Sequence, residues 1–420
     1  MKRVIGKIDP SDKKISIWGA GFSGLILGYY LKKNGYHVTI HEKTNKIGGK
    51  IHTRKISAGL IERGPNALYL NSDGVELLQS LKLEPLPAAK KLKRLLMING
   101  KPKRPLQPSL FAKLGFNLSK KPPLITDGLT VAEFFRPLIG QENIDRYLST
   151  ALSGIYATPS EGLHFKSIFS EVADKAQFSS YWDFIQYFRK IRKNDTRQQE
   201  LSGSVSFEGG MQTLINRLGD ELKHEIKLSS KETFKLKGNN IICTDAYTAS
   251  DLLVPFRPEF AQELKRVRYQ HLSSTTVFVK KEIKPLNRAF GVLIPFTSRY
   301  HSQGILNNKA IFPLNNQNIF SYTLISRKVL NQEEVIHDLN AIYPEITTED
   351  IEHIDTTDWE RAIPVYDLPR FLSIRKLHQL SQKEANLALF GNYVAGISLR
   401  EMISAAKAFA ADPVNYTEVP

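Results

Sequence analysis

Cysteine is almost absent from this sequence, since Cys243 is the only one among 420 residues. A disulfide needs two cysteines, and zinc fingers or iron–sulfur clusters need several. The sequence therefore excludes a disulfide framework and any metal site built on cysteine. Such low cysteine usage is typical of a reducing compartment, so we expect a cytoplasmic protein.

Long hydrophobic runs are also absent. The longest stretch without a charged residue is 15–31, which is at the lower limit for a membrane span and contains four glycines. Residues 1–14 are too short and too polar for a signal or transit peptide. We therefore expect no transmembrane helix.

Acidic residues are in the minority: 42 Asp and Glu against 58 Lys and Arg give a formal charge of +16, which favours binding to anions. The cations lie in short clusters, without a zinc-finger, helix-turn-helix or RNA-binding motif, so we expect no nucleic-acid partner. Hydrophobic residues at 41% and charged residues at 24% are typical of a globular protein. The length allows two or three domains.

The N-terminal region has the pattern of a βαβ unit that binds a dinucleotide. Residues 15–18 predict a buried strand, 25–34 predict a helix that ends at Gly35, and 36–42 predict a second strand. Between the first strand and the helix, the glycines of Gly19-Ala-Gly-Phe-Ser-Gly24 permit a tight turn, close approach of a pyrophosphate and helix–strand packing. Glu42 ends the second strand, where a carboxylate accepts hydrogen bonds from ribose hydroxyls and argues against a 2′-phosphate.

A second glycine pair, Gly48-Gly49, lies six residues after Glu42 and precedes Lys50. This extended pattern resembles the FAD-binding motif of the superfamily of amine oxidases, phytoene desaturases and protoporphyrinogen oxidases. Residues 62–66, Glu-Arg-Gly-Pro-Asn, resemble the loop beside the flavin ring in that superfamily. Near the other end, a predicted strand at 387–390 leads into the motif 391–396, Gly-Asn-Tyr-Val-Ala-Gly.

After this C-terminal motif, Ser398-Leu-Arg-Glu401 predicts a capping box at the start of a helix that runs to about Ala411. The helix N-terminus is either aimed at the flavin, where it would stabilise the reduced anion, or simply capped at the surface. The resemblance implies non-covalent FAD, since Cys243 lies far from this motif in the sequence. The residues expected to contact the cofactor are Gly19, Ala20, Gly21, Phe22, Ser23, Gly24, Glu42, Lys43, Gly48, Gly49, Lys50, Gly64, Pro65, Asn66, Ala67, Trp359, Gly391, Gly396, Ile397, Ser398 and Leu399.

Within this superfamily the chain resembles the protoporphyrinogen oxidase family most. The most specific segments are 207–214, Phe-Glu-Gly-Gly-Met-Gln-Thr-Leu, and the motif 391–396. The resemblance implies oxidation of a porphyrinogen in haem synthesis by three hydride transfers to flavin N5, with oxygen or a quinone-type acceptor. No catalytic residue beyond the flavin is implied, and no metal site is expected. Where family members carry a glycine pair, this chain has Ser326-Arg327.

A porphyrinogen carries propionates, so a cation is needed near its pocket. Arg94 matches the arginine that binds a carboxylate in the family, although it also lies in a cluster of cations with Lys91 and Lys93 that water could solvate. Leu293 and Leu306 fall in segments that form the family's pocket, and a plain core role is equally open for them. Trp359 matches an aromatic residue near the flavin.

The expected fold is α/β, with a Rossmann-like FAD-binding domain, a helical segment able to associate with a membrane, and a sheet-containing substrate domain. The FAD-binding domain is expected at 1–90, 205–255 and 380–420, the helical segment at 91–204 and the substrate domain at 256–379.

Membrane contact is one expectation for residues 101–125, which combine cations with Phe111, Leu114 and Phe116. The segment either lies on an anionic membrane surface, such as that of the inner membrane, or forms an ordinary loop with buried leucines. The resemblance also allows a homodimer.

Two other functions stay open. One is a desaturase or amine oxidase of the same superfamily, and the other is a non-catalytic flavoprotein that carries a tetrapyrrole. Protoporphyrinogen IX and coproporphyrinogen III are not distinguished by the sequence, because that choice depends on cations that folding brings together.

Overall fold

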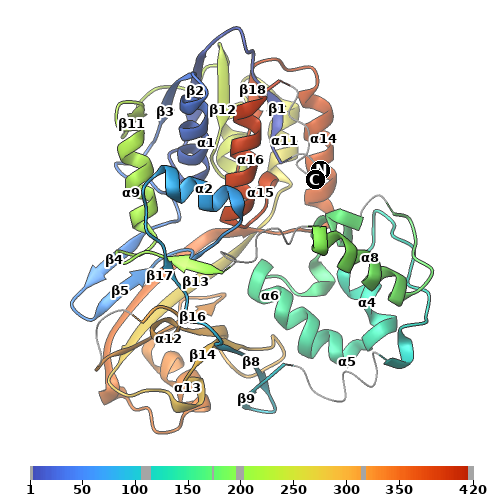
Figure 1. Ribbon diagram of the computed structural model, residues 1–420, viewed down its shortest axis with the longest axis vertical. Coiled ribbons are helices and arrows are strands. Elements are labelled where there is room, and N and C mark those ends of the chain that lie inside the picture. The colour runs from blue at the N-terminus through green and yellow to red at the C-terminus, as the bar shows by residue number, and fades with distance from the viewer. Residues whose placement is uncertain (1–2, 106–114, 173–174, 195–202, 314–317, 415–420) are drawn as a thin grey trace.

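The computed structural model describes residues 3–105, 115–172, 175–194, 203–313 and 318–414 as a mixed α/β protein (Figure 1). Two large sheets lie one above the other in this view, and a lobe of helices stands beside the lower sheet. Phe111 and Leu114, which the sequence placed in the membrane-associating segment, lie outside the described residues. Among the described helices, none is long and apolar enough to cross a membrane.

The first sheet has the strand order β1-β18-β12-β2-β3-β11, and of these six strands only β1 runs antiparallel to its neighbour. The sequence predicted the strand–helix–strand unit of β2, α1 and β3 correctly, with Val38 and Ile40 buried and His37 exposed. The strands come from three distant parts of the chain: β1 (Ile5–Lys7), β2 (Lys14–Trp18), β3 (His37–His41), β11 (Ile226–Lys227), β12 (Asn239–Ile242) and β18 (Leu387–Leu389).

Helices cover both faces of this sheet. On one face lie α1 (Phe22–Lys33), α9 (Gln212–Glu221) and α16 (Leu399–Ala411), and on the other lie α10 (Ala246–Leu253), α11 (Pro258–Lys265) and α14 (Leu368–Ser381). Phe260 of α11 and Ile374 of α14 share a core with Leu387 and Leu389 of β18. These two helices therefore pack on the first sheet, although the sequence assigned α11 and all but the last two residues of α14 to the substrate domain at 256–379.

The second sheet has the order β17-β13-β16-β15-β14-β8-β9. Its pairs are antiparallel except for β8 with β14. One face packs on α13 (Gln332–Ile342), where Val335 and Leu339 meet Val277 and Leu324. Its strands are β8 (Lys93–Ile98), β9 (Lys101–Lys103), β13 (Tyr269–Val279), β14 (Ala289–Leu293), β15 (Ser302–Asn307), β16 (Phe320–Ser326) and β17 (Ile351–Pro364). Because β8 and β9 belong to this sheet, the prediction that residues 91–204 form a helical segment is wrong for its first part.

The helical lobe has a core of its own, in which the rings of Phe134, Phe165 and Phe184 contact one another. Its helix α6 passes close to the second sheet in Figure 1. The lobe consists of α4 (Val131–Ile139), α5 (Gln141–Asn143), the π-helix η1 (Ile144–Ser149), α6 (Thr150–Tyr156), η2 (Ser160–Gly162), α7 (Phe165–Ile168), η3 (Ser170–Val172) and α8 (Tyr181–Asn194).

Short elements connect these bodies. Two small sheets pair β4 with β5, and β10 with both β6 and β7. The connecting elements are β4 (Thr53–Ile56), β5 (Gly59–Glu62), β6 (Leu68–Tyr69), α2 (Ser72–Ser80), β7 (Leu86–Pro87), β10 (Ser204–Ser206), η4 (Lys284–Leu286), α12 (Asn308–Ile311), η5 (Thr348–Asp350) and α15 (Asn392–Ala395).

Candidate cofactor and substrate site

The glycine turn between β2 and α1 leaves a bare backbone cradle. Gly21 is the N-cap of α1 and offers no side chain to the first N–H groups of the helix. It forms a bridge with Gly48 of the second glycine pair, and a Cβ at Gly49 would lie 3.0 Å from the Cα of Gly21. Helix donors without a side-chain cap, beside two bare glycine segments, fit the pyrophosphate of a dinucleotide.

Glu42 follows β3 beside this turn. Its Oε2 accepts a hydrogen bond from the Ala20 N–H at 2.8 Å, and its Oε1 accepts from the N–H and the hydroxyl of Thr44, each at 2.8 Å. A carboxylate has about four acceptor positions, so one stays open for a ribose hydroxyl. Lys43 is exposed next to it.

Lys50 and Trp359 join the glycine-rich region to the second sheet. The Lys50 ammonium donates to the backbone carbonyls of Arg361 and Ala362 in β17, and burial lowers the pKa of Lys50 to about 8. Trp359 Nε1 donates to the carbonyl of Arg63 at 2.6 Å. The indole therefore holds the expected flavin loop, 64–67, against the edge of the sheet.

Two acids that the sequence reasoning did not select also anchor this loop. Asp355 is buried on β17 and pairs with Arg63 at 3.3 Å. Glu62 accepts hydrogen bonds from the Met211 N–H and the Thr53 hydroxyl, each at 2.8 Å, and burial raises the pKa of Glu62 to about 7. The position of Glu62 at the head of the flavin-loop resemblance was a usable signal, whereas no sequence spacing relates Asp355 to Arg63.

The C-terminal motif follows β18 at the same end of the first sheet. Ser398 is the N-cap of α16 as predicted, but the capping box is wrong because Ser398 makes no side-chain cap bond. Glu401 instead pairs with Arg3 at 3.1 Å. The first N–H groups of α16 therefore have no side-chain cap, which suits an anionic group of a ligand.

Tyr366 and Arg370, which the sequence reasoning also missed, hold this motif in place from the segment between β17 and α14 and from α14 itself. The Tyr366 hydroxyl donates to the Asn392 carbonyl and the Arg370 Nε donates to the Tyr393 carbonyl, each at 2.9 Å. The Arg370 guanidinium lies 3.7 Å from the centre of the Tyr366 ring. Tyr156 of α6 has its ring 5.4 Å from that of Tyr366, so these contacts connect the C-terminal motif to the helical lobe.

Cys243 lies close in space to the first glycine turn, despite its distance in sequence. Its N–H donates to the Trp18 carbonyl at 2.8 Å, and its carbonyl oxygen would lie 3.1 Å from a Cβ at Gly19. The side chain is buried in the core beside the first sheet, and this burial raises the pKa of the thiol. The reactive thiolate is therefore disfavoured, which argues against covalent attachment of a flavin here.

The three residues expected to contact the substrate share one face of the second sheet. Gly291 of β14 pairs with Arg94 of β8 on one side and with Leu306 of β15 on the other. Leu293 is two residues further along β14, so its side chain emerges on the same face. This face is opposite to the one that packs on α13, and both leucines are only partly buried.

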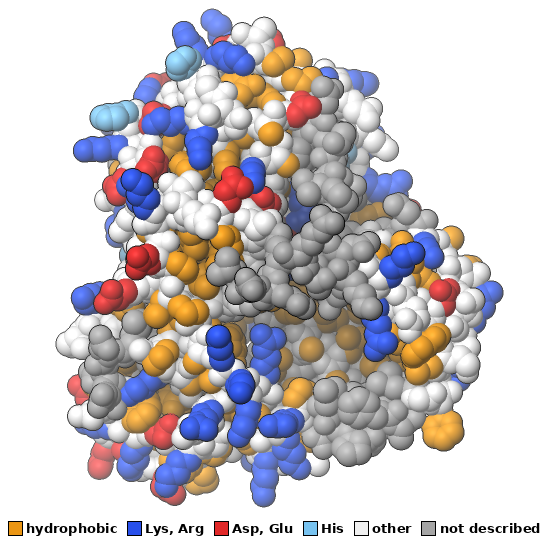
Figure 2. Space-filling model, in the orientation of Figure 1, with side chains coloured by type: hydrophobic (Ala, Val, Ile, Leu, Met, Phe, Trp, Pro, Cys, Tyr) orange, Lys and Arg blue, Asp and Glu red, His pale blue; other side chains and the backbone are white. Residues whose placement is uncertain are grey.

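The helix α6 covers part of this face, because a Cβ at Gly154 would lie 2.8 Å from Leu293 Cδ2. Arg94 is exposed and lies over the Phe290 ring at 5.5 Å, and none of the carboxylates in the described ranges pairs with it. Figure 2 shows a hollow between the part of the molecule built on the second sheet and the helical lobe. Hydrophobic side chains lie inside the hollow, and Lys and Arg side chains lie beside it. A pocket of about 340 Å³, lined by Ile98, Arg146 and Tyr300 among others, opens at the end of β8.

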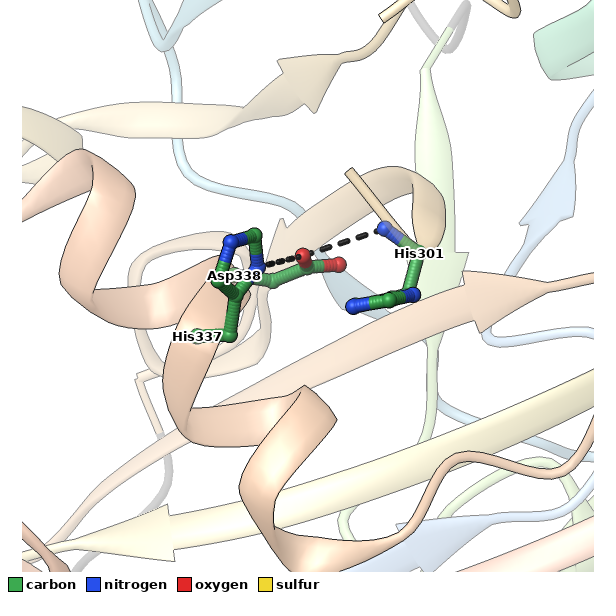
Figure 3. A group of neighbouring side chains, drawn as sticks. All are labelled: His301, His337 and Asp338. Carbon is green, nitrogen blue, oxygen red and sulfur yellow. Dashed lines mark hydrogen bonds and ion pairs between the residues drawn. The ribbon is translucent and has the colours of Figure 1, made fainter. Parts of the chain in front are cut away.

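One group with metal-binding side chains lies apart from this face. It consists of His301, His337 and Asp338 at the start of β15 and in α13 (Figure 3). The buried Asp338 already accepts from the backbone N–H groups of His301 and Ser302, the Ser302 hydroxyl and His337 Nδ1, at 2.6–3.1 Å. These bonds fasten the start of β15 to α13, which gives the carboxylate a structural role.

Comparison with known proteins identifies the family. The model of the flavin containing amine oxidoreductases matches residues 22–233, half of the chain. The chain belongs to this family. It is therefore an FAD-dependent oxidoreductase, and the bare cradle at Gly21, Gly48 and Gly49 fits such a cofactor.

Relatives of this oxidoreductase extend over almost its whole length. Protoporphyrinogen oxidase 2 of Arabidopsis thaliana is 24% identical, over 97% of this chain and 95% of the relative. Coproporphyrinogen III oxidase of Bacillus subtilis is 23% identical, over 96% and 98%. A solved structure of a provisionally assigned protoporphyrinogen oxidase from Exiguobacterium has a TM-score of 0.74 at 17% identity, over 95% and 98%, which shows a shared fold.

Proposed function

We propose that this oxidoreductase converts a porphyrinogen to the porphyrin as a step of haem biosynthesis, acting on protoporphyrinogen IX or coproporphyrinogen III. The observation that carries the proposal is the face of the second sheet on which Arg94 lies beside Leu293 and Leu306. A porphyrinogen needs apolar walls for its macrocycle and a cation for its propionates. Relatives that match nearly the full chain are named as oxidases of such substrates.

We propose that FAD is held without a covalent bond. The glycine turn and the N-terminus of α1 would hold the pyrophosphate, Glu42 the ribose, and the 64–67 loop with Trp359 and the C-terminal motif the flavin ring. When bound, the flavin supplies the hydride acceptor for each two-electron step. The full set of proposed cofactor residues is the one predicted from the sequence. All of them except Trp359 of β17 lie within the proposed FAD-binding domain of residues 1–90, 205–255 and 380–420.

The chain's own contribution would be binding and orientation. Arg94 would fix one propionate, and the leucines of the sheet with α6 would enclose the macrocycle and exclude water. A protonated amine would be repelled by Arg94, for which the described part of the chain supplies no counterion. The same site thus favours a porphyrinogen over the amines that other members of the family oxidise.

The electron acceptor and the membrane association of the enzyme are part of the same proposal. Oxygen or a quinone-type compound would take the electrons from the reduced enzyme. An anionic membrane surface would be contacted through Lys101 and Lys103, both exposed, and Phe116, which is 86% exposed.

Anaerobic mixing of the purified flavoprotein with each porphyrinogen tests the proposal. The expected result is loss of the flavin absorbance at about 450 nm together with the appearance of porphyrin fluorescence. A yellow protein that neither porphyrinogen reduces, but that an amine or a polyene reduces, would refute it. Tight porphyrin binding without any turnover would favour the carrier alternative.

A further inference from the structure

Arg327 is the residue with which this chain departs from the glycine pair of its family resemblance. It directly follows β16, and its guanidinium donates to the carbonyl of Ala157, the C-cap of α6, at 3.1 Å. It also lies over the Phe296 ring, 4.3 Å from the ring centre. Among the described residues no carboxylate pairs with it, so its charge is oriented by two neutral groups and not neutralised.

Arg327 and Arg94 have similar surroundings, because each guanidinium lies over a phenylalanine ring. Arg94 lies over Phe290, near the start of β14, and Arg327 lies over Phe296, three residues beyond the end of β14. Two guanidinium groups without counterions in the described chain therefore stand at opposite ends of the strand that carries Leu293.

Arg94 belongs to the face of the sheet that α6 covers, and Arg327, one residue beyond the end of β16, reaches the C-cap of α6 at Ala157. Arg94 shares a row across the sheet with Leu306 and Thr323, and Arg327 is four residues beyond Thr323. The two Cα atoms are thus separated by three strand spacings, about 14 Å, and by about 13 Å along the strands. Leu293 and Ile325, both only partly buried, lie on the floor between them.

We propose that Arg327 is a second carboxylate-binding site, which takes the propionates at the edge of the macrocycle opposite to the edge bound by Arg94. This inference rests on the proposed function. A porphyrinogen with propionates on one edge satisfies Arg94 alone, whereas one with a propionate on all four rings engages both arginines. The arrangement therefore selects the tetracarboxylate coproporphyrinogen III.

Binding of the oxidised porphyrins to the holoenzyme tests this without requiring turnover. Coproporphyrin III and mesoporphyrin IX, whose two propionates lie on adjacent rings, are titrated against wild type, Arg327→Gln and Arg94→Gln by absorbance. We expect Arg327→Gln to weaken coproporphyrin binding about tenfold and to leave mesoporphyrin binding unchanged, because one charge-assisted hydrogen-bonded pair is lost. Arg94→Gln is expected to weaken both. Arg266→Gln, at the C-cap of α11 on the first sheet, is the matched control.

Equal loss of both ligands in Arg327→Gln would overturn the proposal, because it would mean that Arg327 only supports the end of α6. No loss of either ligand would overturn it as well. Arg327→Lys, which keeps the charge, should recover part of the coproporphyrin affinity. Failure of both porphyrinogens to reduce the wild-type flavin would refute the proposed function, while the binding titrations would still decide the role of Arg327.

Discussion

Gly24 of α1 packs against the carbonyl oxygen of Gly19 so closely that a Cβ on Gly24 would lie 1.9 Å from that oxygen. Gly19 itself has a φ of +105°, which side chains rarely permit. The contact sets the distance between the end of β2 and the start of α1. The backbone that would receive the pyrophosphate thus depends on a helix–strand contact that only glycine allows.

The substitution Gly24→Ala tests this contact. Because the obstructing atom belongs to the backbone, the helix has to shift, and we expect a loss of about 3 kcal/mol in the free energy of unfolding. We also expect the purified protein to contain much less flavin. Chemical denaturation and the ratio of flavin to protein absorbance measure the two effects. Gly128→Ala, where a Cβ would meet nothing within 4 Å, should leave both unchanged.

The substitution Trp359→Phe should loosen the flavin loop without unfolding the chain. It removes the hydrogen bond from the indole to the Arg63 carbonyl and keeps an aromatic ring. The lost bond is worth about 1 kcal/mol, so we expect flavin to bind about five times more weakly. Titration of the apoprotein with FAD measures the affinity. Trp182→Phe, at a tryptophan that is 51% exposed, is the control, and an equal effect there would contradict the assignment.

Glu62 should make the stability of the apoprotein depend on pH. Burial raises its pKa to about 7 from an ordinary value of 4.5, so the folded chain holds a proton that the unfolded chain releases between these values. The resulting stabilisation is complete below pH 4.5 and is lost as the pH rises towards 7, by about 3 kcal/mol.

Glu62→Gln keeps an acceptor for the Met211 N–H and removes the titrating proton. Urea denaturation at pH 5 and pH 7 should therefore show a smaller change in stability for this variant than for wild type. Glu208→Gln, at an exposed position near Met211, should behave like wild type. If the free energy of unfolding of Glu62→Gln changes between pH 5 and pH 7 as much as that of wild type, other groups cause the pH dependence.

Charge reversal in β9 should weaken contact with anionic vesicles. Lys101 and Lys103 are exposed, and each lysine near an anionic surface is worth about 1 kcal/mol. We expect Lys101→Glu with Lys103→Glu to reduce binding to phosphatidylserine vesicles at least tenfold, and Phe116→Ser to reduce it further. Vesicle sedimentation measures this, with Val329→Ser as a control at another exposed apolar residue. Unchanged binding in both test variants would contradict the proposed surface.

The sequence was most informative where local patterns determine local structure. The apolar run at 15–18, the glycine turn and the alternation of Tyr36, Val38 and Ile40 are short-range signals, and the structure has a strand, a turn and a strand there. The start of α16 at Ser398 was predicted for the same reason. Its capping box was not formed, because Glu401 reaches Arg3 instead, a partner from the opposite end of the chain.

Contacts between distant segments could not be predicted from one sequence. Asp355 and Arg63 meet only because β17 passes beside the loop that follows β5. Arg94 and Leu306 become neighbours through Gly291, since the register of three strands decides which side chains share a face. Nothing in the spacing of Ser326-Arg327 indicated that this arginine would reach the end of α6.

Gly154 of α6 packs directly against Leu293, on the face that we propose binds the macrocycle. In Gly154→Ala the new Cβ would lie 2.8 Å from Leu293 Cδ2, the end of a flexible side chain that would have to rotate onto the proposed binding face. Alanine is also the better helix former, so we expect stability to be unchanged or higher by up to about 1 kcal/mol, while porphyrin affinity falls. The double variant Gly154→Ala with Leu293→Ala should restore affinity by reopening the space. Parallel losses of stability and affinity in the single variant would instead mean that α6 has been displaced, and that the glycine serves packing and not the ligand.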